Sequence, residues 1–355
     1  MHTDRQRALV TGGAGFLGSH VCASLLSKGH DVVCLDNFVT GSQQNIDGLM
    51  GEPGFTLLDM DLSEDCPDAG EVDLVLHLAS PASPVQYAAF PIETLRVGSH
   101  GTWHALDAAR RCGARFVLAS TSEVYGDARE HPQRETYWGN VNPIGPRAVY
   151  DEAKRFAEAL TMSYRRTHHV NTGIVRIFNT YGPSMRADDG RVVSTFIRQA
   201  LDGEPLTVAG DGRQTRSLCY IDDTVDAIIR MGTAHCPGPV NIGNPHEISV
   251  LDLAQLVLDL TGSTSDIEFV ELGEDDPRRR CPDVTAARDV LGWEPMTSLE
   301  VGLRRTVQGY VAARLAQDPL WSAALADSEM SSSAAAMTSS AVIERSAGSG
   351  SAAKG

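Results

Sequence analysis

The stretch that decides the fold of this 355-residue chain is RALVTGGAGFLG, residues 7–18. Residues 7–10 have the length and apolar character of a buried strand, and a helix running to about Lys28 is expected after the glycines. Glycines between a strand and a helix let the backbone approach a pyrophosphate at the helix N-terminus. The stretch therefore predicts a dinucleotide-binding fold, with cofactor contacts from Gly12, Gly15, Phe16, Leu17 and Gly18.

The second predicted strand, residues 31–35, is followed by Asp36. A carboxylate at this place binds the hydroxyls of the adenosine ribose, although an acid in a loop can also be merely solvated. Residues 37–44 contain no arginine or lysine that would pair with a 2′-phosphate. These residues indicate NAD rather than NADP as the cofactor.

Short apolar runs recur at residues 72–79, 114–120 and 173–178, separated by helical stretches. Strands that alternate with helices predict an α/β fold with a doubly wound parallel sheet of the Rossmann type. We assign residues 1–182 to this NAD-binding domain. The region 183–318 then contains predicted helices at 222–231, 250–260 and 303–315, which suit a smaller C-terminal substrate-binding lobe with some exchange of chain between the lobes. Residues 319–355 are dominated by alanine, serine and glycine and are expected to be disordered.

The composition limits the possible partners. A formal net charge of −16 argues against nucleic acid binding. The seven cysteines are dispersed without CxxC spacing, which favours reduced thiols in a cytoplasmic protein and no metal site. No apolar run is long enough to span a membrane.

A tyrosine and a lysine four residues apart, Tyr150 and Lys154, share one face of a predicted helix. An ammonium in this place lowers the pKa of the phenol, so that the phenolate can take a proton from a sugar hydroxyl while a nicotinamide is reduced. The YxxxK spacing alone is a weak signal, because a half-buried tyrosine beside a surface lysine is common. It gains weight here from the glycine stretch and from the sequence TSEVYG at residues 121–126.

Four longer stretches carry a family resemblance: HLASPASP (77–84), YWGNVNPIGPR (137–147), RIFNTYGP (176–183) and DGRVVS (189–194). With them the chain resembles the extended short-chain dehydrogenase/reductase family of NAD-dependent epimerases and dehydratases. Within that family it is similar to the UDP-glucuronate decarboxylases, which form UDP-xylose. The likeness runs from about residue 8 to residue 310. The stretch 137–147 is the most specific of the four.

The resemblance implies a cycle without net redox change, in which NAD stays bound. Tyr150 would remove the proton of the glucuronate 4-hydroxyl, Lys154 would hold the nicotinamide ribose, and Thr121 would orient the 4-oxygen. The resulting ketone is β to the C6 carboxylate, so carbon dioxide can leave before the ketone is reduced again. Ser122 and Glu123 would assist at C5. A 4,6-dehydratase has an aspartate where this chain has Ser122, which favours the decarboxylase.

The resemblance also implies the residues that bind the ligands. Arg96, taken to lie at the start of a helix, is the candidate for the substrate carboxylate, and Arg280 is a candidate for the sugar or the diphosphate. Arg216 and Asn179 would contact the phosphates of UDP, whereas Arg191 would lie near cofactor and nucleotide. The remaining cofactor contacts are expected from Asn37, Thr40, Gly41, Asp61, Leu78 and Ala79.

One departure from the family pattern is Gly98, which stands where relatives commonly have an asparagine, so one contact at the active-site backbone must be replaced or lost. His77 and His100 are interpreted as structural.

Members of the family usually form homodimers through a four-helix contact. In this chain the contact would be made by the helix beginning at Tyr150 and the helix near residues 102–111. Three alternatives stay open: a UDP-glucuronate 4-epimerase, a 4,6-dehydratase, and a non-catalytic NAD-binding scaffold.

Overall fold

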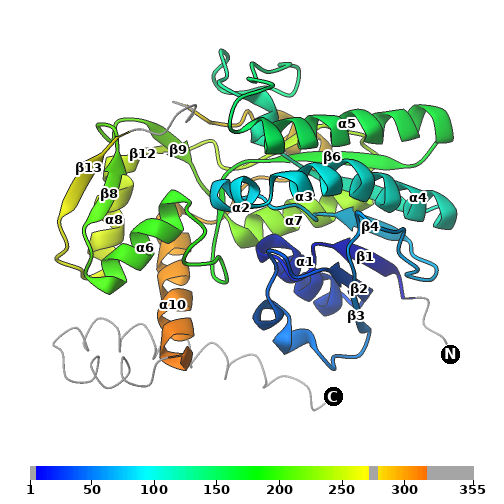
Figure 1. Ribbon diagram of the computed structural model, residues 1–355, viewed down its shortest axis with the longest axis horizontal. Coiled ribbons are helices and arrows are strands. Elements are labelled where there is room, and N and C mark those ends of the chain that lie inside the picture. The colour runs from blue at the N-terminus through cyan, green and yellow to red at the C-terminus, as the bar shows by residue number, and fades with distance from the viewer. Residues whose placement is uncertain (1–4, 272–278, 318–355) are drawn as a thin grey trace, which may run out of the picture.

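The computed structural model describes residues 5–271 and 279–317. Its centre is a seven-stranded parallel sheet in the order β11-β6-β5-β4-β1-β2-β3 (Figure 1). The strands are β1 (Arg7–Thr11), β2 (Asp31–Asp36), β3 (Phe55–Asp59), β4 (Leu74–His77), β5 (Arg115–Thr121), β6 (Thr172–Ile177) and β11 (Val240–Ile242). The strand order reverses beside β1, which is the point where a doubly wound sheet opens a crevice for a ligand.

Helices cover both faces of this sheet. On one face α1 (Phe16–Ser27) packs against α7 (Ile221–Thr233), which also contacts α9 (Thr285–Leu291). On the other face lie α2 (Pro84–Ala89), α3 (Pro91–Arg96), α4 (Thr102–Cys112) and α5 (Ala148–His168) (Figure 1). Successive strand residues point to opposite faces, so Val10 joins one hydrophobic core and Leu9 joins the other. This two-sided burial explains why the central strands read as continuous apolar runs.

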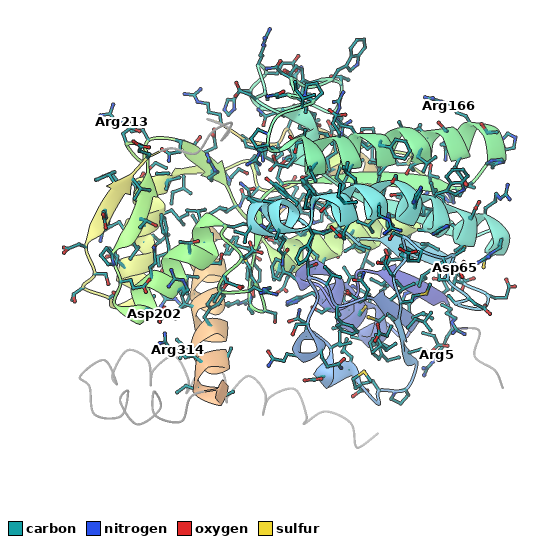
Figure 2. All side chains as sticks on the ribbon, in the orientation of Figure 1. Arg5, Asp65, Arg166, Asp202, Arg213 and Arg314 are labelled. Carbon is teal, nitrogen blue, oxygen red and sulfur yellow. The ribbon has the colours of Figure 1, made fainter. Side chains whose placement is uncertain are left out.

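The second lobe is built around three helices and three small sheets. Its helices are α6 (Val192–Asp202), α8 (Val250–Thr261) and α10 (Leu299–Gln317). Its two-stranded sheets pair β7 (Thr180–Tyr181) with β10 (Cys219–Tyr220), β9 (Thr215–Ser217) with β12 (Glu247–Ser249), and β8 (Leu206–Ala209) with β13 (Ile267–Val270). Figure 2 shows Asp202 of α6 and Arg314 of α10 close together, where their ion pair ties the two helices.

The predicted fold class, a doubly wound parallel sheet with a smaller C-terminal lobe, is confirmed. The chain crosses between the lobes, because β11 pairs with β6 in the large sheet although it lies well beyond residue 183. Strands β3 and β11 were not among the predicted elements, and β11 is only three residues long. The tail predicted to be disordered, 319–355, lies outside the described residues. Within the described part of the chain, no helix has both the length and the apolar character needed to cross a membrane.

Candidate active site

A cavity of about 570 Å³ lies at the carboxyl ends of the large sheet and extends into the second lobe. Nearly all site residues predicted from the sequence line it. Those on the cofactor side are Gly12, Gly15, Phe16, Leu17, Gly18, Asp36, Asn37, Thr40, Asp61, Leu78, Ala79 and Arg191. Those around the expected sugar and nucleotide are Thr121, Ser122, Glu123, Tyr150, Lys154, Asn179, Arg216 and Arg280.

The glycine loop between β1 and α1 is packed too closely for side chains. A Cβ atom on Gly18 would lie 2.0 Å from the carbonyl oxygen of Gly12, and a Cβ on Gly12 would lie 2.8 Å from the backbone of Ala79. Such contacts are far shorter than real Cβ contacts, so both positions require glycine. The loop thus keeps a bare backbone at the N-terminus of α1, as the binding of a pyrophosphate demands.

The substitution Gly18→Ala is expected to abolish retention of NAD, because the new methyl group must displace the backbone of the loop. The matched control is Gly48→Ala, since a Cβ on the exposed Gly48 meets nothing within 4 Å. The measurement is the NAD content of each purified protein after heat release. A normal NAD content in the Gly18 variant would show that the loop does not carry the cofactor.

Asp36 closes the adenosine side of the cavity at the end of β2. Its carboxylate accepts hydrogen bonds from the backbone N–H groups of Ala14 (2.9 Å) and Phe38 (2.9 Å). Burial nevertheless raises the pKa of this carboxyl above its ordinary value. Gly41 does not line the cavity. It packs behind Asp36, where a Cβ would come within 2.8 Å of the carboxylate oxygen. A buried acid fixed by the glycine loop fits the ribose of NAD.

Tyr150, Thr121 and Lys154 meet at the wall of the cavity. All three side chains are buried, and the Thr121 hydroxyl forms a hydrogen bond with the Tyr150 phenol. The Lys154 Nζ donates a 2.9 Å hydrogen bond to the carbonyl oxygen of Ala119, and it lies 5.9 Å from the centre of the Tyr150 ring. The three groups therefore form one connected set at the end of β5 and the start of α5.

The pKa values in this set differ from the sequence-based prediction. Burial raises the pKa of Tyr150, whereas the hydrogen bond from Thr121 lowers it by less. Burial also lowers the pKa of Lys154 to about 8. The predicted lowering of the Tyr150 pKa by Lys154 is thus not found in the structure. Desolvation disfavours the phenolate of Tyr150 and the ammonium of Lys154 alike.

Glu123 binds two arginines at the sugar end of the cavity. Arg280 forms two hydrogen bonds with its carboxylate, one of them 2.9 Å long from Nη2 to Oε2, and Arg147 Nη2 donates to Oε2 at 2.6 Å. Burial by itself would raise the pKa of Glu123, but the charges of Arg280 and Arg147 outweigh it and hold the pKa at about 2. Glu123 is consequently an anion at neutral pH and cannot act as a proton donor in this arrangement.

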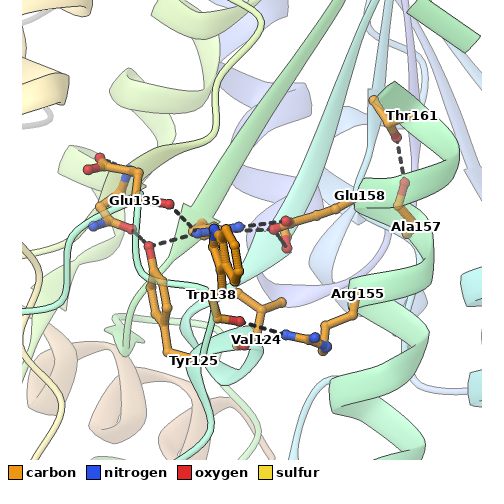
Figure 3. A network of polar contacts seen from close by, with 11 residues as sticks. Val124, Tyr125, Glu135, Trp138, Arg155, Ala157, Glu158 and Thr161 are labelled. Atoms are coloured by element: carbon orange, nitrogen blue, oxygen red, sulfur yellow. Dashed lines mark hydrogen bonds and ion pairs between the residues drawn. The ribbon is translucent and has the colours of Figure 1, made fainter. Parts of the chain in front are cut away.

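A second polar network connects α5 to the backbone at Val124 and Trp138 (Figure 3). Arg155 of α5 donates to the carbonyl oxygens of Val124 (3.2 Å) and Trp138 (3.0 Å). Behind them, Arg176 pairs with Glu158 at 2.7 Å, and its Nη1 donates to the hydroxyl oxygen of Tyr125 at 3.0 Å. The contact at Trp138 ties the start of the diagnostic stretch, residues 137–147, to α5.

Comparison with known proteins identifies the family. The family model described as "NAD dependent epimerase/dehydratase family" matches residues 8–243. The chain belongs to this family. It is 50% identical over 305 residues to UDP-glucuronic acid decarboxylase 1 of Danio rerio, covering 86% of this chain and 72% of the relative. It is also 51% identical over 298 residues to UDP-glucuronic acid decarboxylase 3 of Arabidopsis thaliana, covering 84% and 86%.

Solved structures of the same fold support the assignment. One is UDP-glucuronic acid 4-epimerase from Bacillus cereus in complex with UDP-glucuronic acid and NAD, with a TM-score of 0.77, 29% identity, and coverage of 87% of this chain and 100% of that one. Another is the dTDP-glucose 4,6-dehydratase DesIV from Streptomyces venezuelae with NAD bound, with a TM-score of 0.80, 27% identity, and coverage of 89% and 100%. As a member of an NAD-dependent family with a fitting glycine loop and Asp36, the protein uses NAD as its cofactor.

Arg96, like Gly41, is a predicted site residue that does not line the cavity. It lies at the end of α3 rather than at the start of a helix, and its guanidinium pairs with Glu64 at 2.5 Å on the surface. Sequence reasoning missed Arg147 and Tyr87. Arg147 lies within the quoted stretch 137–147, only three residues before Tyr150, whereas no sequence signal indicated that Tyr87 of α2 stacks on the Tyr150 ring at 5.4 Å.

The unusual Gly98 has a structural reason in this member of the family. It lies in a π-helical turn, η3 (Val97–Gly101), that packs directly against α5, where a Cβ would come 2.6 Å from the Cβ of Ala153. The side chain expected from the family pattern would therefore collide with the residue next to Lys154. His77 is buried between the hydroxyls of Thr11 (2.8 Å) and Thr102 (3.1 Å), a structural position.

The polar residues predicted to bind the nucleotide lie among apolar ones such as Phe196 and Leu218. Arg216 of β9 donates to the carbonyl oxygen of Thr215 at 2.9 Å, and Arg191 pairs with Asp189 at 3.0 Å. Asn179 lines the cavity between β6 and β7. Among the residues that the structure describes, no group of three or more histidine, cysteine, aspartate or glutamate side chains is arranged to hold a metal ion.

Proposed function

We propose that the protein converts UDP-glucuronate to UDP-xylose and carbon dioxide, with NAD retained between turnovers. One observation carries the proposal: the Thr121–Tyr150–Lys154 set lies in the same cavity as Glu123 with its two arginines. An acid–base group for a sugar hydroxyl thus stands beside a site for a carboxylate. The decarboxylase relatives at about half identity over most of the chain support the same reaction.

The first step is removal of the proton from the 4-hydroxyl of the sugar. Tyr150 takes this proton. The Thr121 hydroxyl, which is hydrogen-bonded to the Tyr150 phenol, orients the 4-oxygen of the sugar. Bound NAD supplies the acceptor for the C4 hydrogen, a positive charge that favours the phenolate, and the same hydrogen for the final reduction. Lys154, held by Ala119, adds a second positive charge beside the phenol.

The second step is loss of carbon dioxide from the 4-keto acid. Because the new ketone is β to the C6 carboxylate, the electrons of the breaking C5–C6 bond move onto the C4 oxygen. Thr121 and Tyr150 can donate hydrogen bonds to this oxygen while its charge develops, which lowers the barrier. A proton drawn from the solvent then adds at C5, and the ketone is reduced to give the xylose ring.

Arg147 and Arg280 replace Arg96 as the groups that meet the substrate carboxylate. Both line the cavity, and both are held in place by the Glu123 anion. Because Glu123 already accepts from both guanidinium groups, the pair can attract a second carboxylate without binding it as firmly as two unpaired arginines would. Ser122, which is buried and lines the cavity, is proposed to act near C5. Arg216, Asn179 and Arg191 are proposed for the diphosphate.

In the deciding experiment, the NAD-loaded protein is incubated with UDP-glucuronate. The products are followed by proton NMR, and the released carbon dioxide is measured. UDP-xylose with catalytic NAD supports the proposal. UDP-galacturonate without carbon dioxide would make the protein a 4-epimerase, the activity named for the Bacillus cereus structure. An unchanged substrate spectrum in the presence of bound NAD would favour a non-catalytic NAD-binding scaffold.

A cytoplasmic location stays a prediction, consistent with seven cysteines that are all free thiols.

We also propose a homodimer through the outer face of α3, α4 and α5. This face exposes large apolar side chains although its helices pack together: Ile92, Leu95, Trp103 and Phe156. Trp103 is 51% exposed and Phe156 49%, which is unusual for such side chains on neighbouring helices.

Trp103→Asp is accordingly expected to convert the dimer to a monomer, because a charge would be buried in the contact. The measurement is the molar mass by light scattering during size-exclusion chromatography. Met296→Asp is the control, since Met296 is also strongly exposed but lies between α9 and α10. A wild-type protein that already runs as a monomer would overturn the proposed dimer.

A further inference from the structure

Asp151 is a buried carboxyl group that the reaction described above does not use. It follows Tyr150 in the first turn of α5 and is only 5% exposed. Its Oδ1 atom is buried and makes no hydrogen bond to any residue that the structure describes. Buried polar side chains nearly always have such a partner, so an oxygen left without one requires an explanation.

The surroundings of Asp151 are those of the carboxylate site. The charged groups that act on it are Glu123 of η4 (Ser122–Tyr125), Arg147 at the N-cap of α5, Arg280, and Glu152 on its own helix. The charge of Asp151 also raises the pKa of the phenols of Tyr87 and Tyr150. Burial, and then the Glu123 anion, raise the pKa of Asp151 to about 7, although Arg147 and Arg280 oppose this. Oδ1 of Asp151 is thus an acceptor without a partner among the residues that the structure describes. The approach of an arginine would favour the charged form of this carboxyl and would pair with it.

Arg147 is the arginine that can make this move. Its backbone oxygen accepts the N–H of Asp151 (3.2 Å), so the two residues stand one helical turn apart. Side chains at positions i and i+4 of a helix are neighbours. Arg147 holds Glu123 through one nitrogen only, Nη2, whereas Arg280 holds the same carboxylate through two. Arg147 can thus leave Glu123 without leaving that anion unpaired.

We propose that Asp151 is a positioning residue that provides a second docking point for the Arg147 guanidinium during decarboxylation. This inference rests on the proposed function. In the first position Arg147 lies beside Glu123 and attracts the C6 carboxylate of the substrate. In the second position it lies on Asp151, farther from C6, while Arg280 stays on Glu123.

The chemistry of the second step explains why such a movement is useful. A cation beside the C6 carboxylate stabilises the negative charge that must leave that group, so it holds the ground state more firmly than the transition state. Only interactions that are stronger in the transition state speed the chemical step. Withdrawal of Arg147 to Asp151 removes this stabilisation and leaves the developing C4 oxyanion to Thr121 and Tyr150. No bond to Asp151 is formed or broken.

The test is a double-mutant cycle with Asp151→Asn and Arg147→Gln in the NAD-loaded enzyme, with UDP-glucuronate as substrate. Reduced nicotinamide is followed by its absorbance, and carbon dioxide and UDP-xylose are measured separately. Asp151→Asn is expected to lower kcat about tenfold with an unchanged or lower KM, and to accumulate reduced nicotinamide with the 4-keto acid. In the Arg147→Gln background the same change should add less than about twofold, because two residues that act through one contact are not additive.

Control variants separate this role from a structural one. Glu152→Gln makes the same chemical change at the next position, where Glu152 is half-exposed and faces Arg155 at 3.5 Å, and should leave kcat unchanged. Asp151→Glu keeps the carboxylate and should restore most of the rate. If Asp151→Asn does not fold, Asp151→Ser takes its place in the cycle.

The outcomes distinguish the inference from the proposed function. A wild-type protein that releases no carbon dioxide refutes the proposed function, and the inference with it. A wild-type decarboxylase in which Asp151→Asn is fully active, or lowers the rate equally with and without Arg147, refutes only the second docking point.

Discussion

Replacing Tyr150 with phenylalanine is expected to lower kcat for UDP-xylose formation by about 10³-fold, within the range for loss of a positioned acid–base group. The phenol is the group on which both proton movements at the C4 oxygen depend. It lies next to Thr121 and within 5.9 Å of the Lys154 ammonium, measured from the ring centre. Among the described residues, Tyr150 is the phenol that contacts Thr121 and also lies near Lys154. The loss should therefore appear in kcat rather than in KM.

The fold should tolerate this substitution. A phenylalanine ring keeps the packing against Tyr87, whose ring is nearly parallel to that of Tyr150 at 5.4 Å, and it removes a hydroxyl that burial disfavours when charged. Normal NAD content and a normal melting temperature are expected, with activity measured by NMR. Tyr164→Phe on the same helix is the control, because its hydroxyl donates to Asp107 (2.9 Å) instead. Equal loss of activity in both variants would mean that the defect is in the helix and not in the proton transfer.

Local signals in the sequence predicted many of the residues that line the cavity. The glycine loop and Asp36 lie in the unit formed by β1, α1 and β2, and Tyr150 and Lys154 lie one turn apart on α5. Short spacings along the chain therefore place the members of each pair relative to one another. The sugar end depends on distant contacts. Arg280 is 157 residues from Glu123, and nothing in the spacing shows that it meets Glu123 together with Arg147.

The errors have physical causes of the same kind. Arg96 is basic and close to the site in the sequence, but α3 turns it toward Glu64 at the surface. The predicted lowering of the Tyr150 pKa considered only the nearby charge of Lys154. Burial, which depends on the packing of α2 and β5 over α5, acts in the opposite direction and is larger. Desolvation is a property of the whole fold and cannot be read from a four-residue spacing.

The ion-pair cluster at Glu123 leads to the second large effect. Glu123→Gln is expected to lower the free energy of unfolding by about 3–5 kcal/mol, because it leaves the buried Arg280 and the half-buried Arg147 without their anion. The same substitution should abolish decarboxylation, since neither arginine would keep its position. Urea unfolding and carbon dioxide release measure the two effects. Glu300→Gln, which disrupts an exposed pair with Arg304, is the control and should change stability by less than about 1 kcal/mol.

The pH dependence of stability tests whether the charge of Glu123 is the cause. A carboxyl whose pKa is lowered from 4.5 to about 2 by folding binds fewer protons in the native state than in the unfolded state. Its stabilisation, on the order of 3 kcal/mol, is thus fully present above pH 4.5 and is lost as the pH falls toward 2. The gap in stability between wild type and Glu123→Gln should therefore narrow across this acidic range. A gap that stays constant between neutral pH and pH 2 would show that the introduced glutamine disturbs packing, and that the charge of Glu123 does not hold the two arginines in place.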